Sequence, residues 1–371
     1  MSVTVKDLTS IMEEYFPLHL AEEWDNSGLQ VGDLNQSVQR VGLALDPSPK
    51  IIEKACHAGV ELLITHHPLL FSPVKKVDFT STTGKLIKQL IESGITLYSA
   101  HTNLDIAEQG LNFYLAKQLD LQEIQPLPSS RHELLYKLVV YVPVTHEEQV
   151  RRAVNQAGAG HIGAYRDCSF RVPGTGTFRP LAGTKPFLGR INELEEVEEF
   201  RLETILPHKL VPQVLKAMKA AHPYEEVAYD LYALANRGSD LAPGRSGILP
   251  ELMKLEELAQ HVKSRLGLDS VKVVGDLERK VNRVAVISGS GASFIEAVYR
   301  QGIQVLITGD VKYHEACFAR DIGLAIIDAG HQGTEEVAVE LLATLLQAEA
   351  QTRGLIIRII SLYEEICLKN I

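Results

Sequence analysis

The chain has 371 residues, of which 45% are hydrophobic and 23% are charged, values typical of a folded protein of roughly two to three domains. These values exclude a chain that is disordered, collagen-like or coiled-coil throughout. The formal charge is −10, from 37 Lys and Arg against 47 Asp and Glu, so no sequence-wide basic field favours nucleic acid as a partner.

The first residues contain no basic segment followed by an apolar core, and no apolar run approaches the roughly 20 residues that span a bilayer. The four cysteines show no C-x-x-C spacing and do not form the disulfide framework of a small secreted protein. They are Cys56, Cys168, Cys317 and Cys367. We therefore expect a cytoplasmic protein with reduced thiols and no membrane partner.

The first part of the chain alternates helical and strand-like segments. Helical apolar spacing covers residues 5–14, and residues 40–46 form a short apolar strand pattern. Residues 49–58 then predict a helix that ends at Gly59, and residues 60–65 predict the next strand. A strand, helix and strand in this order favour a parallel sheet and an α/β class.

The sequence pattern changes after residues 126–131, which have the composition of a linker. Two successive β-α-β passages follow, which suggest a ferredoxin-like insert. Its predicted elements are a strand at 134–142, a helix at 147–158, a strand from 160 onward, a strand at 200–206, a helix at 210–221 and a strand at 227–234. Residues 193–199 carry five glutamates and predict a solvated face or loop.

The pattern of the first part returns near the end of the chain. Val284 precedes Gly302 by 18 positions, as Val41 precedes Gly59, and apolar strands follow both glycines. The predicted fold is α/β, a duplicated three-layer α/β core domain with pseudo-twofold halves plus an inserted ferredoxin-like α+β domain. The boundaries are 1–126 for the first half of the core, 127–240 for the insert and 241–371 for the second half. A chance likeness between two βαβ units is the alternative.

Histidines gather where four apolar strands end. In open α/β sheets, ligands bind beyond the carboxyl ends of the strands. Five of the thirteen histidines lie in the four segments that follow these ends, residues 65–68, 100–105, 308–315 and 329–335. They are His66, His67, His101, His314 and His331.

The spacing of these residues favours metal ligation. His331 and Glu335 are four residues apart and would share one face of a helix. His66 and His67 are consecutive, and the proline after them ends the strand's regularity, so both rings could turn toward one cavity. Asp105 supplies a carboxylate able to bridge two ions.

Three imidazoles and two carboxylates without a thiolate suit a divalent ion such as Zn, Mn, Fe, Co or Ni, with Zn favoured. One ion usually takes three or four protein ligands, so five ligands predict two ions that share the carboxylates. The alternative for any single histidine at a strand end is a hydrogen-bonded structural role.

Other segments leave two interpretations open. Residues 289–293 form either a phosphate-binding turn or a plain turn, and residues 22–32 form a loop that covers a site or caps the sheet. Lys312 and His314 are either acid–base groups or the start of a surface helix. Residues 222–229 allow a second ligand site, although a packing role is favoured.

At these motifs the sequence resembles the GTP cyclohydrolase I type 2 homolog family, also called the Nif-three-like family, in its long bacterial form. The matching stretches are residues 23–32, 63–70, 99–105, 308–315 and 328–335. The resemblance implies a dinuclear metal site whose ligands map onto His66, His67, Asp105, His331 and Glu335. It also implies a toroidal homohexamer and an insert similar to PII and copper-tolerance domains.

The predicted function is a dinuclear metal-dependent hydrolase acting on a nucleotide or another small phosphorylated or heterocyclic substrate. A GTP cyclohydrolase-like activity is what the family name implies. His101, Lys312 and His314 are the candidates for catalytic proton transfer. The alternative is a non-enzymatic metal-binding, metal-delivery or regulatory protein with a sensor insert, and an interaction scaffold is a third.

Overall fold

The computed structural model describes residues 2–128 and 132–365, and of residues 239 and 240 only the backbone. The chain divides into two compact units. The core unit comprises Met1–Ser129 and Leu241–Ile371, and the insert unit comprises Ser130–Asp240. Cys367 lies outside the described residues, and Cys56, Cys168 and Cys317 are free thiols. The two units belong to a mixed α/β fold with several sheets.

The first sheet of the core unit has the strand order β1-β4-β3-β2-β15. Its strands are β1 (Gly28–Val31), β2 (Arg40–Ala44), β3 (Leu62–Thr65), β4 (Thr96–Ser99) and β15 (Arg358–Ser361). All pairs are parallel except the one between β1 and β4. Every residue of β3 and β4 is buried, as expected for parallel strands covered on both faces.

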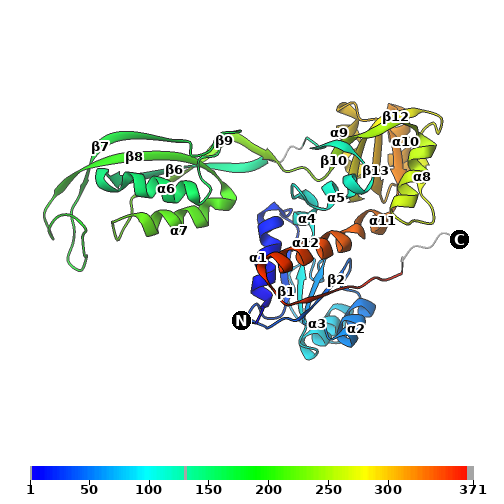
Figure 1. The fold of residues 1–371 in the computed structure, drawn as a ribbon, viewed down its shortest axis with the longest axis horizontal. Coiled ribbons are helices and arrows are strands. Elements are labelled where there is room, and N and C mark those ends of the chain that lie inside the picture. The colour runs from blue at the N-terminus through cyan, green and yellow to red at the C-terminus, as the bar shows by residue number, and fades with distance from the viewer. Residues whose placement is uncertain (1, 129–131, 366–371) are drawn as a thin grey trace. The chain divides into compact units, whose positions relative to one another are not determined.

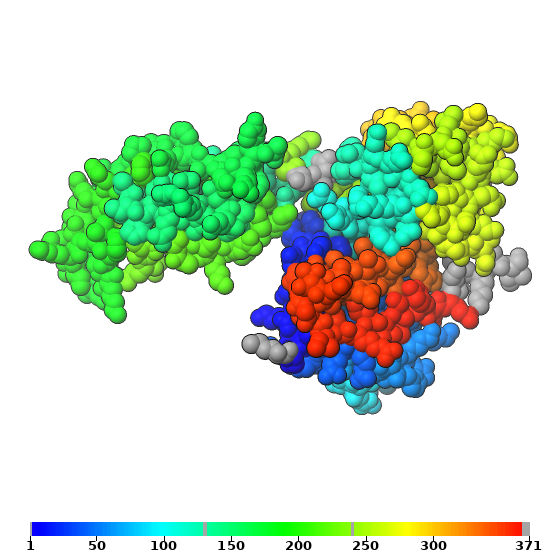
Figure 2. All heavy atoms as spheres, in the orientation of Figure 1, coloured from blue at the N-terminus to red at the C-terminus, as the bar shows by residue number. Residues whose placement is uncertain are grey.

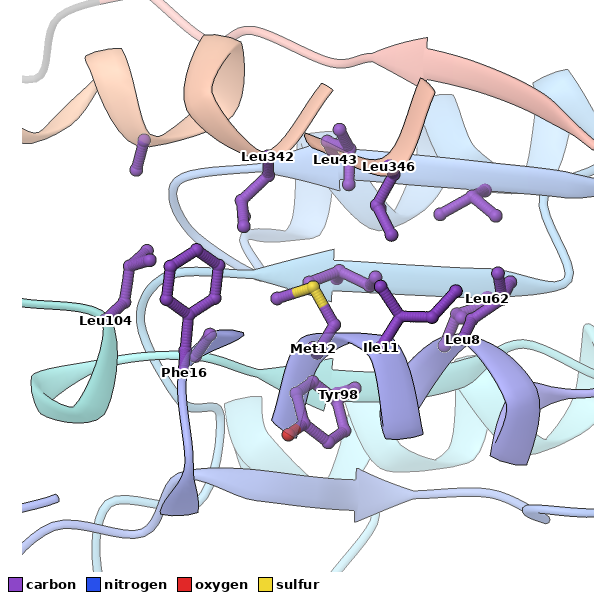
Figure 3. Close-up of a cluster of buried hydrophobic side chains, with 14 of the residues drawn as sticks. Leu8, Ile11, Met12, Phe16, Leu43, Leu62, Tyr98, Leu104, Leu342 and Leu346 are labelled. Carbon is purple, nitrogen blue, oxygen red and sulfur yellow. The ribbon is translucent and has the colours of Figure 1, made fainter. Parts of the chain in front are cut away.

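Helices cover both faces of this sheet (Figure 1). They are α1 (Val5–Tyr15) and α12 (Val337–Arg353) on one face, and α2 (Pro49–Ala58) and α3 (Thr82–Glu92) on the other. Helix α2 begins where the Ser48 side chain accepts a hydrogen bond from Ile51 N–H, and it ends at Gly59 in the left-handed region (φ 64°). Figure 3 shows Leu8 and Ile11 of α1 and Leu342 of α12 packed into one apolar cluster.

The second sheet of the core unit has the strand order β11-β14-β13-β12-β10-β5. Its strands are β5 (Gln122–Pro126), β10 (Arg245–Lys254), β11 (Lys272–Val274), β12 (Lys280–Ser290), β13 (Val305–Gly309) and β14 (Ala325–Asp328). Strands β12, β13 and β14 are parallel neighbours. One face packs on α5 (Leu111–Gln118) and α8 (Leu255–Arg265), and the other on α9 (Ile295–Arg300) and α10 (Tyr313–Ile322).

The two sequence halves of the core interlock. Strand β5 comes from the first half and pairs with β10 in the second sheet, whereas β15 comes from the last residues and pairs with β2 in the first sheet. Helix α12 also packs against α1, and the orange and blue surfaces of these segments meet in Figure 2. The repeat spacing did not predict this exchange, because spacing within a half carries no information about pairing between halves.

The insert unit has one antiparallel sheet with the strand order β7-β8-β6-β9. Its elements are β6 (His132–Pro143), α6 (Glu147–Gln156), β7 (Ser169–Phe178), β8 (Glu195–Pro207), α7 (Val211–Ala221) and β9 (Tyr229–Asp240). Both helices cover one face of the sheet (Figure 1). The strand predicted from residue 160 begins only at Ser169.

Another prediction for the insert is partly wrong. Residues 195–199 of the glutamate-rich segment belong to β8, where exposed and less exposed side chains alternate, and Glu199 is buried.

The described residues also form short 3-10 helices. They are η1 (Leu18–Leu20), η2 (Val144–His146), η3 (His208–Leu210) and η4 (Ala292–Phe294). Within the described residues, no helix has the length and apolar character needed to cross a membrane.

Candidate metal centre

The strand ends of the core unit bring histidines and carboxylates into one cluster. Side-chain atoms of His66, His67 and His101 form one group with all ligand atoms within 4.8 Å, and those of His67, His331 and Glu335 form another. His67 belongs to both groups. Among the described residues these are the two groups able to hold a metal ion.

Two short helices carry the other members of this cluster to the strand ends. Helix α4 (Thr102–Ile106) follows β4 and carries Asp105, and helix α11 (His331–Glu335) follows β14. Within α11 one turn separates His331 from Glu335, which places both side chains on one face.

The four imidazoles of the cluster all use Nδ1 for a hydrogen bond within the protein. Their Nδ1 atoms face oxygen acceptors, which makes Nδ1 the N–H donor of a neutral ring and leaves the Nε2 lone pair free. The pairs are His66 with the Ala100 carbonyl (2.8 Å), His67 with Asp46 (2.7 Å), His101 with Asp25 (2.8 Å) and His331 with Asp310 (2.7 Å). Metal-ligating histidines are held by this kind of outer hydrogen bond.

The Nε2 atoms of two rings converge on one carboxylate oxygen. Nε2 of His67 and Nε2 of His331 each lie 3.0 Å from Oε2 of Glu335. In the described part of the chain, that oxygen and Nε2 of His66 are both buried without a hydrogen-bond partner. Lone pairs that face each other in a buried site repel unless a cation lies between them. The cluster therefore fits either a metal ion or added protons.

Added protons are the natural competitor of a metal ion here. Burial disfavours a charged His67 ring, but the hydrogen bonds that the protonated ring makes to Asp46 and Glu335 outweigh burial and raise the pKa of His67 to about 10. The hydrogen bond that a protonated His331 makes to Glu335 likewise raises the pKa of His331 to about 9. Burial alone would raise the pKa of Glu335, but the surrounding imidazoles hold it well below its usual value. Metal binding at this cluster must therefore displace protons.

The Asp105 carboxylate lies on the His66 side of the cluster. Its Oδ1 is 3.8 Å from Nε2 of His66, and Oε1 of Glu335 is also 3.8 Å from that nitrogen. The Ser288 hydroxyl donates to Asp105 Oδ1 at 3.1 Å, and the Asn112 amide donates to Ser288 Oγ at 3.0 Å. Burial raises the pKa of Asp105. Glu335 thus directs one oxygen toward His66 and the other toward His67 and His331.

A glycine gives the Glu335 carboxylate its space. Gly289 adopts a φ of 61°, and a Cβ at this position would lie 2.2 Å from Oε1 of Glu335. Its N–H donates to Thr334 Oγ1 at 2.9 Å, and the Gly291 N–H donates to Thr308 Oγ1 at 2.8 Å. Because protein atoms already accept from these two amides, neither amide is available to a phosphate, and the turn at residues 289–293 borders the cluster.

Strand β1 (Gly28–Val31) occupies part of residues 22–32, so the prediction of a loop holds only for residues 22–27, and this loop supports the cluster from the other side. The Asp25 side chain is fully buried and accepts hydrogen bonds from His101 Nδ1 and from the Ser27 hydroxyl (2.8 Å). Trp24 is 58% exposed and stacks on Phe71, with 5.9 Å between ring centroids and 12° between planes. Both rings meet the His101 ring nearly edge-on. This loop therefore positions His101 and adds an exposed aromatic pair beside it.

The structure does not place His314 among the potential ligands. Lys312 and His314 are both exposed at the start of α10, and His314 belongs to neither of the two groups of potential ligands. The backbone N–H of Lys312 donates to Glu315 at 2.8 Å, as at an ordinary helix start. Sequence reasoning missed the carboxylates that orient the rings, Asp25, Asp46 and Asp310. A signal existed for the last two, since each lies within two residues of the end of an apolar strand.

Comparisons with known proteins place these observations in a family. A family model described as Duf34/NIF3 (NGG1p interacting factor 3) matches residues 3–365. The GTP cyclohydrolase 1 type 2 homolog of Halalkalibacterium halodurans is 44% identical over 90% of this chain and 91% of the relative. The protein of the same name from Bacillus subtilis is 42% identical over 89% and 88%.

Two solved structures are similar over nearly their whole length. A Bacillus cereus protein related to NIF3 has a TM-score of 0.86 at 42% identity, with 100% of this chain and 99% of that chain covered. Staphylococcus aureus protein SA1388 has a TM-score of 0.77 at 27% identity, with the same coverage. The similarity therefore extends through both units of the chain.

Proposed function

We propose, from the premise that this chain belongs to the Duf34/NIF3 family, that its core unit holds two divalent metal ions and catalyses the hydrolysis of a small substrate. Family membership confirms the resemblance seen in the sequence motifs. One observation carries the proposal, which is that Nε2 of His67 and Nε2 of His331 face a buried carboxylate oxygen that has no hydrogen-bond partner among the described residues.

The proposed ligands divide into two sets that share Glu335. One set is His66, Asp105 and Oε1 of Glu335, and the other is His67, His331 and Oε2 of Glu335. Imidazoles and carboxylates without thiolates suit Zn, Mn, Fe, Co or Ni, and we favour Zn. Among the described residues, carboxylate oxygens of Glu335 lie within 3.8 Å of Nε2 of three histidines, whereas Asp105 lies that close only to His66. We therefore assign the bridging role to Glu335.

The ions would supply Lewis acidity for water activation and substrate polarisation. The protein's contribution to proton transfer is His101, whose ring Asp25 holds from the Nδ1 side. A ring nitrogen of His101 lies within 4.8 Å of ring nitrogens of His66 and His67. His101 is therefore our candidate for accepting or donating a proton, ahead of Lys312 and His314.

The exposed aromatic pair beside His101 supports a flat heterocyclic substrate. Trp24 and Phe71 are both about half exposed and stack on each other next to the cluster. Aromatic faces offer offset stacking and a large contact area to a planar ring. Of the substrate classes expected from the sequence, a nucleotide or another heterocycle fits this surface better than a simple phosphoester.

We also propose the finer architecture that the sequence suggested. The β-α-β-β-α-β order of the insert unit and its sheet order β7-β8-β6-β9 support a ferredoxin-like insert. The parallel triplets β2-β3-β4 and β12-β13-β14 support a duplicated core. A cytoplasmic location and a toroidal homohexamer of 41.0 kDa chains remain predictions, and sedimentation velocity tests the assembly.

A substrate screen tests the proposed function. The full-length protein is stripped with chelator, reloaded with Zn or Mn, and assayed against nucleotides, heterocyclic amides and phosphoesters. We expect turnover that needs metal, is lost in His67→Ala, and persists in the control His57→Ala, because His57 is exposed on α2. Tight metal uptake without turnover on any class would favour the non-enzymatic metal-binding alternative. No metal uptake at all would overturn the site.

A further inference from the structure

The open face of the insert sheet contains a cavity of about 630 Å³. Alternation along the strands explains its position, because Val140 and Leu202 face the two helices whereas Tyr141, Glu199 and Arg201 face the opposite side. The segment of residues 222–229, for which the sequence left a second ligand site open, forms part of its wall.

Two glycines of β7 create the space around Glu199. Gly174 is the direct cross-strand partner of Glu199, and a Cβ there would meet no atom within 4 Å, so this position opens into the cavity. Gly176 lies on the same face, and a Cβ there would lie 2.1 Å from Oε2 of Glu199. Any larger residue at 176 would displace the carboxylate from its present position.

The Glu199 side chain is largely buried and has few polar partners among the described residues. The residue is only 8% exposed, and its Oε1 accepts a hydrogen bond from the Tyr224 hydroxyl at 3.0 Å. Within residues 2–128 and 132–365, no ion pair is formed by Glu199, and the nearby Arg201 is paired with Glu203 at 3.0 Å. A carboxylate removed from water is stabilised when a cation with hydrogen-bond donors reaches it.

Aromatic rings surround the approach to this carboxylate. The Phe178 and Tyr224 ring centroids are 5.7 Å apart at an interplanar angle of 58°, and those of Phe187 and Tyr224 are 6.3 Å apart at 50°. All three rings line the cavity, and an aromatic ring attracts a cation that lies over its face. The further carboxylate Glu225 is anchored by the backbone N–H of Lys185 at 3.1 Å.

A metal ion fits this cavity less well than an organic cation does. The ring of the neighbouring His222 uses both nitrogens, since Nδ1 accepts from Tyr224 N–H at 3.1 Å and Nε2 donates to the Tyr141 carbonyl at 3.0 Å. In the core cluster, by contrast, the Nε2 atoms are free. Both groups of potential metal ligands found among the described residues lie in the core unit.

We propose that the insert unit binds an organic cation, an ammonium or amidinium group attached to a flat apolar body. The cationic group donates to Glu199, and the apolar body lies among Phe178, Phe187 and Tyr224. This site is independent of the metal cluster and of the hydrolase function proposed above.

Three probes of nearly the same shape test the charge requirement: benzamidine, neutral benzamide and anionic benzoate. Each is titrated into the full-length protein, and binding is followed by ligand-observed NMR. Because hydrogen bonds to a charged group are the stronger ones, benzamidine is expected to bind at least about tenfold more tightly than benzamide, and benzoate more weakly still. Equal binding of the three probes, or no benzamidine binding at about 10 mM, would overturn the proposal.

Variants place the binding in this cavity. Glu199→Gln is expected to remove the preference for benzamidine over benzamide, whereas Glu198→Gln keeps it, because Glu198 is exposed on the other face of β8. Phe187→Ala is a second variant in case Glu199→Gln folds poorly, since Phe187 is 48% exposed and its loss should weaken the binding of benzamidine. His67→Ala should leave benzamidine binding unchanged. Loss of binding in His67→Ala, or an unchanged preference in Glu199→Gln, would refute the assignment.

Discussion

Replacing Asp25 with asparagine tests how the loop before β1 holds His101. The Asp25 carboxylate is buried and accepts hydrogen bonds from His101 Nδ1 (2.8 Å), the Ser27 hydroxyl (2.8 Å) and the Thr102 N–H (3.1 Å), together with the Thr102 hydroxyl. Asparagine keeps the shape but loses the charge, and its amide group turns one acceptor position into a donor. Oδ1 accepts from His101 Nδ1 and from the Asn26 N–H (2.7 Å), and Oδ2 accepts from the other three donors, so either placement of the amide nitrogen leaves at least two donors without their acceptor.

The magnitude follows from the number of bonds lost. A hydrogen bond to a charged group contributes about 1.5–3 kcal/mol, so the loss of two predicts a decrease of roughly 3–6 kcal/mol in the free energy of unfolding. For a unit of this size, about 2–4 °C per kcal/mol corresponds to a melting temperature lower by roughly 6–24 °C.

The effect also has a defined pH dependence. Burial opposes ionisation of Asp25, but its hydrogen bonds outweigh burial and hold its pKa well below the usual value of 3.8. A carboxylate with a lowered folded-state pKa stabilises the protein above its unfolded-state pKa and loses this contribution as the pH falls toward the folded-state value. The difference between wild type and Asp25→Asn should therefore be full at pH 7 and shrink below about pH 4.

The assay is denaturant unfolding of the metal-free protein, followed by the fluorescence of Trp24 and by far-ultraviolet circular dichroism. Trp24 is the only tryptophan and is adjacent to the substitution. Glu23→Gln is the control, because Glu23 is exposed in the same loop. A loss below about 1 kcal/mol, or a difference that is the same at pH 7 and pH 3, would refute the reasoning.

Three further predictions concern the core unit. Glu335→Gln should weaken Zn binding more than 100-fold in calorimetric titrations, beyond the 10–100-fold typical of an outer-shell change such as Asp310→Asn, and a smaller loss in Glu335→Gln would contradict its bridging role. Zn uptake should release protons, and the affinity for Zn should increase from pH 6 to pH 8, because the pKa of metal-free His67 is raised to about 10. Calorimetric heats of Zn binding that do not depend on the ionisation heat of the buffer would exclude competition between protons and Zn. Arg245→Met should lower the free energy of unfolding by roughly 3–5 kcal/mol. The reason is that the buried guanidinium donates to several carbonyls, among them the Ala107 oxygen at 2.6 Å. A change below about 1 kcal/mol in chemical denaturation would contradict this prediction.

Local signals predicted the elements of the core well. For α2 the sequence shows a serine cap, a proline in the first turn and a glycine stop, and the structure has the helix at Pro49–Ala58. The helix predicted at residues 5–14 lies at Val5–Tyr15. Apolar periodicity and caps act over a few neighbouring residues, so one sequence is enough to recognise them.

The insert shows where such signals fail. Five glutamates in residues 193–199 resemble a solvated segment, yet Glu199 is buried in β8. Its environment depends on Gly174 and Gly176 of the neighbouring strand, which leave space for the carboxylate. Charge content along the chain does not report which residue lies across a sheet.

The sequence by itself determined which residue types stand at the ends of the buried strands. Because parallel strands end at a common edge of their sheet, His66, His67 and Asp105 of one half could be expected near one site, and likewise His331 and Glu335 of the other. Tertiary structure alone decided which ring nitrogen is free, since that depends on an acceptor distant in the chain, such as Asp310 for His331.

Tertiary structure also decided how the two halves interlock. Strand β15 completes the first sheet and β5 completes the second, and each pairs with a strand more than 100 residues away in the chain. Edge strands expose unpaired backbone groups that many partners could satisfy, so their local sequence does not specify the partner. Packing of the complete core unit specifies it, because only the folded arrangement brings the matching edges together.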